Sequence, residues 1–233
     1  MSAATVTQLR EEIASCTRLL VMHGIMDFSG HVSARIPGQD RILLQPKDTS
    51  RITLRAEDLL VIDLDGNVLE GGGTPPLETA LHICMYRARP EVHAVCHGHP
   101  SISTLFSVVE QPWRAVRNFA YRFTDVPVHP DTTHIRTEEQ GRAVAAALGT
   151  HRLCLLRAHG TVAVSSSIQE LFMDCLDFEE NARSLLYASH LGTLLPLTSN
   201  EIQALCASYG RSETRAAKVW EHCLEKARLM GVL

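Results

Sequence analysis

Two histidines separated by a single residue close a short apolar segment of the sequence. The segment reads EVHAVCHGHP and places His97 and His99 just before a proline. Alternate side chains of a β-strand point to the same face, so an extended backbone would direct both imidazoles into one space. Two neutral imidazoles in this arrangement supply half of a divalent-metal site. The same pattern is compatible with two exposed strand-end histidines that bind nothing.

Two distant segments offer further ligands. His159 follows the apolar segment CLLRA and precedes Gly160, which would allow a tight turn beside it. Glu78 follows GGGTPP and would lie in the first turn of a helix. Catalytic zinc sites commonly combine three protein ligands with an open position, and a nearby carboxylate can be a fourth ligand or the acid/base. Each residue also has a structural interpretation, because Glu78 could simply favour the helix dipole and His159 could be a satisfied strand-end histidine.

The elements that would carry these residues alternate between strands and helices. Helical spacing and capping signals predict helices over residues 5–24, 77–89, 137–148, 168–191 and 200–229, and residues 101–109 are helix-like. Strands are predicted over residues 31–35, 41–46, 59–69 (a hairpin with an Asp65-Gly66 turn), 91–99 and 154–166, with strand and loop over 113–129. This order indicates an α/β fold. Three further histidines, His82, His93 and His129, are interpreted as structural residues.

Composition limits the class of protein. The chain has 233 residues, of which 45% are hydrophobic, and no linker or repeat interrupts it, so we expect one domain over residues 1–233. A net charge of -4 with interspersed signs argues against a nucleic-acid partner. No apolar run reaches the roughly 18 residues of a membrane span, and the N-terminal segment lacks a signal-peptide core. Seven scattered cysteines without a CxxC pair indicate buried, reduced thiols in a cytoplasmic protein.

Four segments taken together resemble the class II aldolase/adducin family. They are Gly30-x-Val32-Ser33-x-Arg35, the Pro-x-x-Glu-x-x-x-His pattern of residues 75–82, RPEVHAVCHGHP and RAHGTVAVSSSIQEL, and the resemblance extends over residues 10–185. It implies a three-layer α-β-α fold with a central, mostly antiparallel mixed sheet. It also implies a homotetramer that acts on a small-molecule substrate at sites between its subunits.

The same resemblance assigns roles to the candidate ligands. It implies one divalent metal ion per subunit, held by His97, His99 and His159. Glu78 matches the family's acid/base glutamate, which can also bind the metal. Histidine and carboxylate ligands suit Zn²⁺ or Mn²⁺, and also Fe²⁺ or Co²⁺, so the residue types leave the identity of the metal open.

Departures from the aldolase pattern change the expected substrate. His31 stands where the aldolases have asparagine, and Pro76 and Leu77 stand where they have two serines that help to hold the substrate phosphate. Proline and leucine offer no side-chain donor, which argues against a sugar phosphate. The GHVSAR segment, with Gln45-Pro46 after it, is more similar to the branch that decarboxylates hydroxylated aromatic or pyridine dicarboxylates, dihydroxyphthalate among them.

We therefore expect a metal-dependent decarboxylase in which the metal chelates the ring hydroxyl and the adjacent carboxylate. Glu78 would handle the proton that replaces the lost carboxyl group, with a pKa raised by partial burial. The expected substrate contacts are Ser29, Gly30, His31, Ser33, Arg35, Gln45 and Lys47. Among them Arg35, Lys47 and His31 are candidates for a second carboxylate, although Arg35 and Lys47 could be ordinary surface charges.

Two other functions are compatible with the sequence. A class II aldolase could act on a non-phosphorylated hydroxy-keto substrate with the same metal site. An adducin-like module would interact with other proteins and catalyse nothing. The complete set of three histidines and a glutamate argues against this module, because the family's cytoskeletal members lack those ligands.

Overall fold

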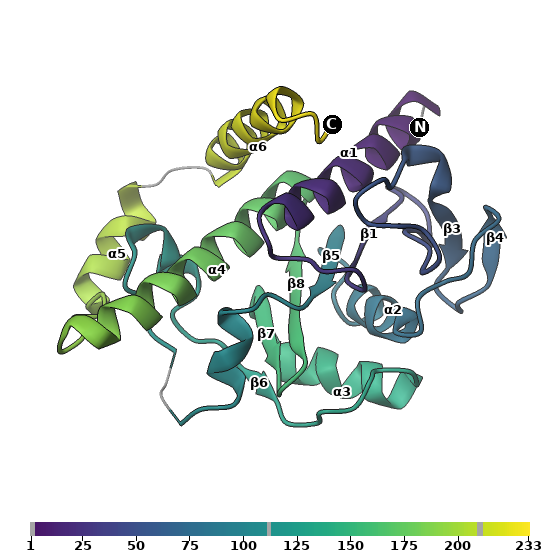
Figure 1. Cartoon of the computed structure of the whole chain (residues 1–233). Helices are drawn as coiled ribbons and strands as arrows, with labels where there is room; N and C mark the ends of the chain where they lie inside the picture. Colours follow the sequence, from purple (N-terminus) through teal and green to yellow (C-terminus); the bar gives the residue numbers. More distant parts are fainter. Residues whose placement is uncertain (1–2, 111–112, 209–211) are drawn as a thin grey trace.

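A single eight-stranded sheet with helices on both faces organises the chain (Figure 1). The computed structural model describes residues 3–110, 113–208 and 212–233. The helices are α1 (Ala3–Met22), α2 (Thr79–Ala88), α3 (Glu138–Leu148), α4 (Ile168–Leu191), α5 (Ser199–Ser208) and α6 (Ser212–Leu229), with 3-10 turns η1 (Ala56–Asp58), η2 (Ser103–Ser107) and η3 (Asn118–Arg122). The strands are β1 (His31–Arg35), β2 (Arg41–Leu44), β3 (Leu60–Asp63), β4 (Val68–Glu70), β5 (Ala94–Gly98), β6 (Val128–His129), β7 (Leu153–Leu156) and β8 (Gly160–Ser165).

The strand order places three site-bearing strands side by side in the middle of the sheet. The order is β4-β3-β2-β1-β5-β8-β7-β6, and every neighbouring pair is antiparallel except β6 and β7. His31 on β1 pairs with His97 on β5, and His97 pairs with Val162 on β8. The expected mixed, mostly antiparallel sheet is confirmed, and its register brings residues from distant segments together.

Side-chain alternation divides the apolar core into two layers. On β5, Ala94 and Cys96 face α1, α4 and α6, whereas Val95 faces α2 and α3. His97 lies two residues after Val95 and therefore points to the same side, toward α2. The three-layer α-β-α architecture is thereby confirmed. The candidate metal ligands lie between the sheet and α2.

Local signals account for most of the element boundaries. The Thr137 side chain accepts a hydrogen bond from the Gln140 N–H to begin α3, and Gly149 (φ +54°) ends the helix. Gly66, at φ +91°, turns the chain between β3 and β4 as the hairpin signal predicts. Local hydrogen bonds and backbone conformation are therefore enough to explain where these elements begin and end.

Some elements differ from the expectation. The helix-like segment 101–109 forms only the 3-10 turn η2, and the segment 113–129 adds the turn η3 to the short strand β6. The expected helix 200–229 is two helices, with residues 209–211 outside the described part. Glu78 is the N-cap of α2 and not a first-turn residue, because the Pro76 carbonyl accepts from the Thr79 N–H and hydroxyl and the helix begins after that turn.

The cysteines are free thiols, as expected, and all but Cys206 are buried. Among the described helices, none has the length and hydropathy that a bilayer crossing requires.

Candidate metal centre

His97 and His99 lie at the end of β5, with their Nε2 atoms 3.1 Å apart. The His97 side chain is fully buried, and its Nδ1 lies 2.9 Å from the carbonyl oxygen of Thr161 on β8. That carbonyl can only accept, so Nδ1 carries a proton, and Nε2 is the nitrogen that faces the other candidate ligands. His99 follows the strand by one residue and remains beside it because the chain continues extended to Pro100.

His159 reaches the same point from the turn between β7 and β8. A Cβ on Gly160 would lie 2.3 Å from the Gly98 carbonyl oxygen and 2.8 Å from His99 Cδ2, so only glycine permits this close approach. The left-handed residue of the turn is Ala158, at φ +54°. The sequence expectation of a tight turn beside His159 is confirmed, but the strain falls on Ala158, while Gly160 supplies space.

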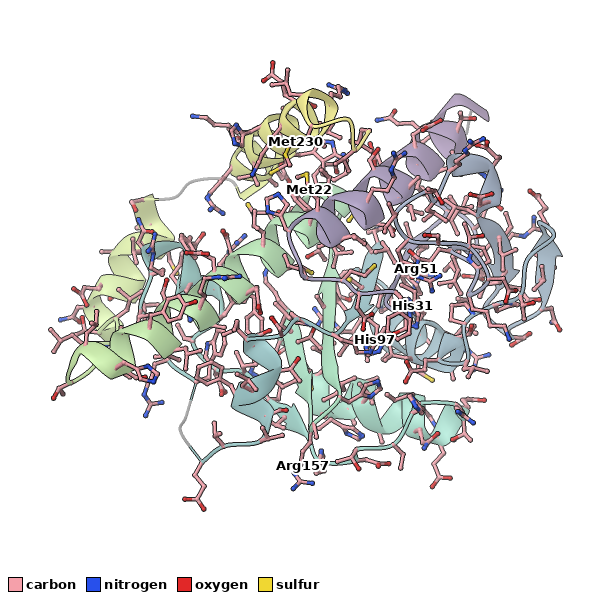
Figure 2. The ribbon with its side chains drawn as sticks, in the orientation of Figure 1. Met22, His31, Arg51, His97, Arg157 and Met230 are labelled. Atoms are coloured by element: carbon pink, nitrogen blue, oxygen red, sulfur yellow. The ribbon has the colours of Figure 1, made fainter. Side chains whose placement is uncertain are left out.

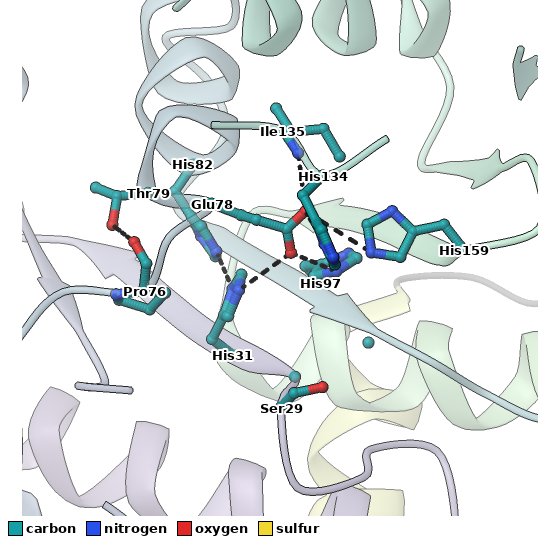
Figure 3. A network of polar contacts seen from close by, with 12 residues as sticks. Ser29, His31, Pro76, Glu78, Thr79, His82, His97, His134, Ile135 and His159 are labelled. Atoms are coloured by element: carbon teal, nitrogen blue, oxygen red, sulfur yellow. Dashed lines mark hydrogen bonds and ion pairs between the residues drawn. The ribbon is translucent and has the colours of Figure 1, made fainter. Parts of the chain in front are cut away.

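Glu78 joins the histidines from the N-cap of α2, as Figure 3 shows. Its Oε2 lies 3.1 Å from His97 Nε2, and its Oε1 lies 3.7 Å from His159 Nε2. The Ile135 N–H donates to Oε1 at 3.0 Å, which orients the carboxylate. Ligand atoms of His97, His99 and His159 lie within 4.8 Å of one another. The three predicted histidines and the glutamate therefore form one cluster.

Unsatisfied nitrogen atoms in the cluster fit a bound cation. Both Nδ1 and Nε2 of His159 are buried and have no hydrogen-bond partner among the described residues. A buried polar group left in this way costs on the order of 1–3 kcal/mol, and coordination of an ion by Nε2 would remove part of that cost. Three imidazoles and one carboxylate are also a chemically suitable donor set for a divalent ion. The residues present thus fit the metal that the sequence predicts.

The electrostatics keep the ligands in their metal-binding forms. Burial lowers the pKa of His159 to about 4, with the neighbouring His97 contributing, so this imidazole is neutral at pH 7. Burial raises the pKa of the Glu78 carboxyl, but the hydrogen bond and charge of His97, and then the Ile135 N–H and His159, outweigh burial and lower it to about 2. The expectation of a raised pKa is wrong for this cluster, and Glu78 is a carboxylate.

A second carboxylate, missed in the sequence, orients His99. The Asp27 carboxylate oxygens both lie 3.1 Å from His99 Nδ1, and Oδ1 also accepts from the Ser29 N–H at 2.8 Å. Such outer-shell carboxylates set the tautomer of a ligating imidazole. A turn motif, Asp-x-Ser-Gly, is the signal that could have identified Asp27.

A cavity of about 250 Å³ opens beside the cluster. Of the predicted substrate contacts, Ser29, His31 and Lys47 line it. His31 Nε2 lies 3.8 Å from Glu78 Oε2, and the Ser29 hydroxyl lies 3.2 Å from His99 Nδ1. The other lining residues are Phe28, Arg51, Pro76, Leu77, Glu78, His99, His134 and His159.

Four predicted substrate contacts have structural positions instead. The Gly30 carbonyl accepts from Gln45 Nε2 (2.9 Å) and from Arg51 Nε (2.8 Å), and the fully buried Gln45 side chain also bonds the Thr17 hydroxyl and the Val32 N–H. This pair holds the loop before β1 against β2. Neither residue lines the cavity, so the substrate-contact expectation is corrected for both.

Ser33 and Arg35 lie progressively farther along β1. Arg35 is four residues from His31, or roughly 13 Å at the rise of a β-strand. Its guanidinium donates to the backbone carbonyls of Tyr86 (2.6 Å) and Val92 (3.4 Å). Ser33 is fully buried against His82 and Tyr86. The sequence expectation for these two residues is also corrected, because the strand direction carries them away from the cavity.

Arg51 is a functional candidate that the sequence did not reveal. It is only 4% exposed, its Nε donates to the Gly30 carbonyl (2.8 Å), and its Nη1 donates to the carbonyls of Pro46, Lys47 and Thr49. Within the described residues, no carboxylate lies within ion-pair distance of this guanidinium and nothing accepts from Nη2, although Asp27 and Asp48 act on its charge from farther away. Figure 2 labels it next to His31. Its position in an irregular loop offers no periodic signal, and only the tertiary structure identifies it.

His134 is a third residue that the sequence did not single out, after Asp27 and Arg51. It lies in the loop before α3, its side chain is 65% exposed, and its Nδ1 is 3.8 Å from Glu78 Oε1. Its ring packs edge-on against His159 at a centroid distance of 5.3 Å. His134 thus closes the solvent side of the cluster.

Comparisons with known proteins identify the family of this chain. The family model described as "Class II Aldolase and Adducin N-terminal domain" matches residues 11–186. A 3,4-dihydroxyphthalate decarboxylase from Arthrobacter keyseri is 28% identical, covering 97% of this chain and 96% of the relative. A second, from Rhodococcus jostii, is 26% identical over 97% and 99% of the two chains.

Among solved structures, an L-fuculose 1-phosphate aldolase from Glaciozyma antarctica superposes with a TM-score of 0.83 at 21% identity. The match covers 99% of this chain and 94% of the aldolase, and at this identity it bears on the fold alone. The family model, by contrast, spans most of the chain and all four cluster residues. This protein therefore belongs to the class II aldolase and adducin family.

Proposed function

We propose that this protein is a divalent-metal-dependent decarboxylase of a hydroxylated aromatic or pyridine dicarboxylate. The observation that carries the proposal is a shared cavity. Glu78, His99 and His159 of the cluster and the buried guanidinium of Arg51, which has no carboxylate within ion-pair distance among the described residues, open onto the same space of about 250 Å³. A substrate with a chelating end and a separate anionic end would satisfy both.

The relatives support this class of substrate. Both full-length relatives carry the name of a decarboxylase that acts on 3,4-dihydroxyphthalate, a ring with two hydroxyl and two carboxylate groups. The cavity also offers apolar surface for a ring, because Phe28 and Leu77 line it with 86% and 59% of their surfaces exposed. Leu77 and Pro76 provide no donors for a phosphate.

A divalent ion bound by His97, His99 and His159 would supply a Lewis acid for the negative charge left as carbon dioxide departs. The residues themselves manage the proton. Because Glu78 is ionised, its Oε2 first accepts the proton of the substrate hydroxyl and then returns it to the ring carbon that lost the carboxylate. The product hydroxyl regains a proton from solvent, which balances the reaction.

Binding of the second carboxylate falls to Arg51 and Lys47. Three backbone carbonyls hold Arg51 Nη1 in place, and Nη2 remains available for a substrate oxygen. Lys47 is exposed at the edge of the cavity and adds positive charge. A preorganised guanidinium loses little entropy on binding a carboxylate, which favours Arg51 as the main anchor.

The proposal is tested by the products. The Mn²⁺-loaded protein should release carbon dioxide from 3,4-dihydroxyphthalate and leave L-fuculose 1-phosphate intact. Aldehyde release from a hydroxy-keto substrate, phosphorylated or not, would support the alternative aldolase function instead. A protein that binds no stoichiometric metal and converts neither class of substrate would overturn both enzyme functions in favour of an interaction module.

Arg51→Lys gives a sharper test of substrate orientation. Loss of the guanidinium Nη2 donor should raise KM for the dicarboxylate by roughly 10- to 100-fold, the effect of losing one charged hydrogen bond. A hydroxylated monocarboxylate without the second anionic group should show no such change, which controls for misfolding. Arg35→Lys is the matched control, since this arginine also binds backbone carbonyls but lies outside the cavity. Equal effects of the two substitutions would contradict the role of Arg51.

We also propose a single domain over residues 1–233 and a homotetramer. Family membership supports both. Light scattering of the purified protein tests the assembly, and a mass of one chain would contradict it.

A further inference from the structure

A buried hydrogen-bond chain runs from the cavity into the layer between the sheet and α2. His31 Nδ1 lies 2.7 Å from His82 Nε2, and His82 Nδ1 lies 2.6 Å from the Ser33 hydroxyl. The Ser33 hydroxyl in turn lies 2.8 Å from the Tyr86 hydroxyl. All four side chains are between 0% and 2% exposed. Figure 3 shows the first contact, with His82 on the side of His31 away from Ser29.

The two elements supply alternate members of this chain. His31 and Ser33 are two residues apart on β1 and share its α2-facing side. His82 and Tyr86 are four residues apart on α2 and share its sheet-facing side. The four polar groups therefore interlock across one strand–helix contact. A spacing of two residues is the side-chain period of a strand, and a spacing of four residues is close to one turn of a helix.

Every interior member of the chain has partners on both sides, so the protons must all be ordered in one direction. In the first order, Tyr86 donates to Ser33, Ser33 donates to His82 Nδ1, and His82 Nε2–H donates to His31 Nδ1. His31 then carries its own proton on Nε2, which points toward Glu78. In the reverse order, His31 Nε2 is a lone pair and Tyr86 must donate to another acceptor.

Both ends of the chain favour the first order. At one end, His31 Nε2 lies 3.8 Å from the carboxyl oxygen Oε2 of Glu78, a hydrogen-bond acceptor beside which an N–H is favourable and a lone pair is not. At the other end, the Ser33 hydroxyl, 2.8 Å away, is the acceptor that the described residues offer to the Tyr86 hydroxyl, and only the first order uses it. Because Tyr86 is 1% exposed and leads no farther, the chain is a static support and cannot conduct protons to solvent.

We propose that His82, Ser33 and Tyr86 are positioning residues that hold His31 as its neutral Nε2–H tautomer. His31 then donates a hydrogen bond into the cavity and cannot bind the metal, although its ligand nitrogen lies within 4.8 Å of those of Glu78 and His97. The identity of the acceptor, a hydroxyl or carboxylate oxygen of the substrate, rests on the proposed function. The tautomer does not.

The tautomer is measured directly by long-range ¹H–¹⁵N correlation on the Zn²⁺-loaded, full-length protein labelled at histidine. His31, assigned by its absence in His31→Asn, should show a protonated Nε2, an unprotonated Nδ1 and no zinc-induced shift. Ser33→Ala and Tyr86→Phe should mix the two tautomers without changing zinc stoichiometry. Ser103→Ala is the matched control, because Ser103 is a fully buried serine whose hydroxyl has no partner among the described residues.

A protonated Nδ1 or a zinc-shifted Nε2 at His31 in the intact protein would overturn the proposal. An unchanged tautomer in both folded variants would overturn it as well. With an active substrate in hand, Ser33→Ala should lower kcat/KM about tenfold, and an effect confined to stability would contradict the role. The NMR result does not depend on any substrate, so failure of the decarboxylation assay leaves this test intact.

Discussion

Two buried polar regions on opposite faces of the sheet are built on different principles. On the α4 side, Asp174 and Asp177 hold three arginines in pairs, with Arg122 2.8 Å from Asp174 and 2.7 Å from Asp177. Arg152 and Arg215 complete this arginine network. On the α2 side, the cluster holds three imidazoles and one carboxylate, and the guanidinium of Arg51 nearby has no carboxylate within ion-pair distance among the described residues. In the first region, each aspartate is paired with arginines of the same network. In the second region, the Arg51 guanidinium has no such carboxylate and can bind a ligand.

This difference separates stability from function. A buried charge without its partner is strongly unfavourable, so removal of one member of the arginine network should destabilise the fold. In the histidine cluster, burial lowers the pKa of His159, which keeps this imidazole neutral, and both of its nitrogen atoms are left unsatisfied where a ligand would bind. Substitutions in the two regions should therefore affect different measurements.

The largest effect is expected for His159→Ala. Removal of one of three imidazole ligands should abolish stoichiometric metal binding and reduce turnover by more than about 10³-fold, while the metal-free protein remains as stable as wild type or more so. Metal analysis, turnover and urea unfolding in chelator measure the three quantities. His129→Ala is the control, because His129 is also buried (7% exposed) but lies outside the cluster. Retention of the metal in His159→Ala would remove His159 from the ligand set.

Glu78→Gln should separate proton transfer from metal binding. The amide keeps the shape of the side chain but cannot take up the substrate proton, so turnover should fall by roughly 10²- to 10⁴-fold. Metal should be largely retained, since three imidazoles remain. Complete loss of the metal in this variant would instead make Glu78 an essential ligand.

Asp174→Asn should act on stability alone. The fully buried Asp174 carboxylate pairs with Arg122 and Arg152, and loss of its charge should reduce the free energy of unfolding by about 3–5 kcal/mol. Urea unfolding measures the change, and the metal content should not alter. Asp65→Asn, which breaks an exposed pair with Arg87, should cost less than about 1 kcal/mol. Equal losses from the two substitutions would contradict a special contribution of the arginine network.

The smallest effect is a pH dependence of the metal-free protein. Burial lowers the pKa of His82 to about 3, so the unfolded chain takes up a proton near pH 6.5 that the folded chain does not. The contribution of His82 is fully present above pH 6.5 and is lost as the pH falls toward 3, by at most about 1.4 kcal/mol per pH unit. Urea unfolding at pH 7.5, 6.0 and 5.0 measures the slope. His82→Gln should reduce it, and an unchanged slope would refute this origin.

The sequence determined much of this protein because its strongest signals are local or family-wide. Strand alternation carries His97 to the face toward α2, and the Thr137 cap and the Asp65-Gly66 turn mark their elements correctly. The four cluster residues were likewise predicted from motif resemblance. These features depend on backbone periods, turn chemistry and spacing along the chain.

Only the tertiary structure decided what surrounds those residues. Arg35 appeared to be a substrate contact because it belongs to a motif, yet four residues of strand carry it away from the cavity, and Arg51 from an irregular loop lies there instead. The pKa of Glu78 falls and does not rise, because His97 and the Ile135 N–H converge on it from distant segments. The pKa of a side chain and the lining of a cavity depend on all the residues that lie nearby in space. The spacing of residues along the sequence does not reveal those neighbours.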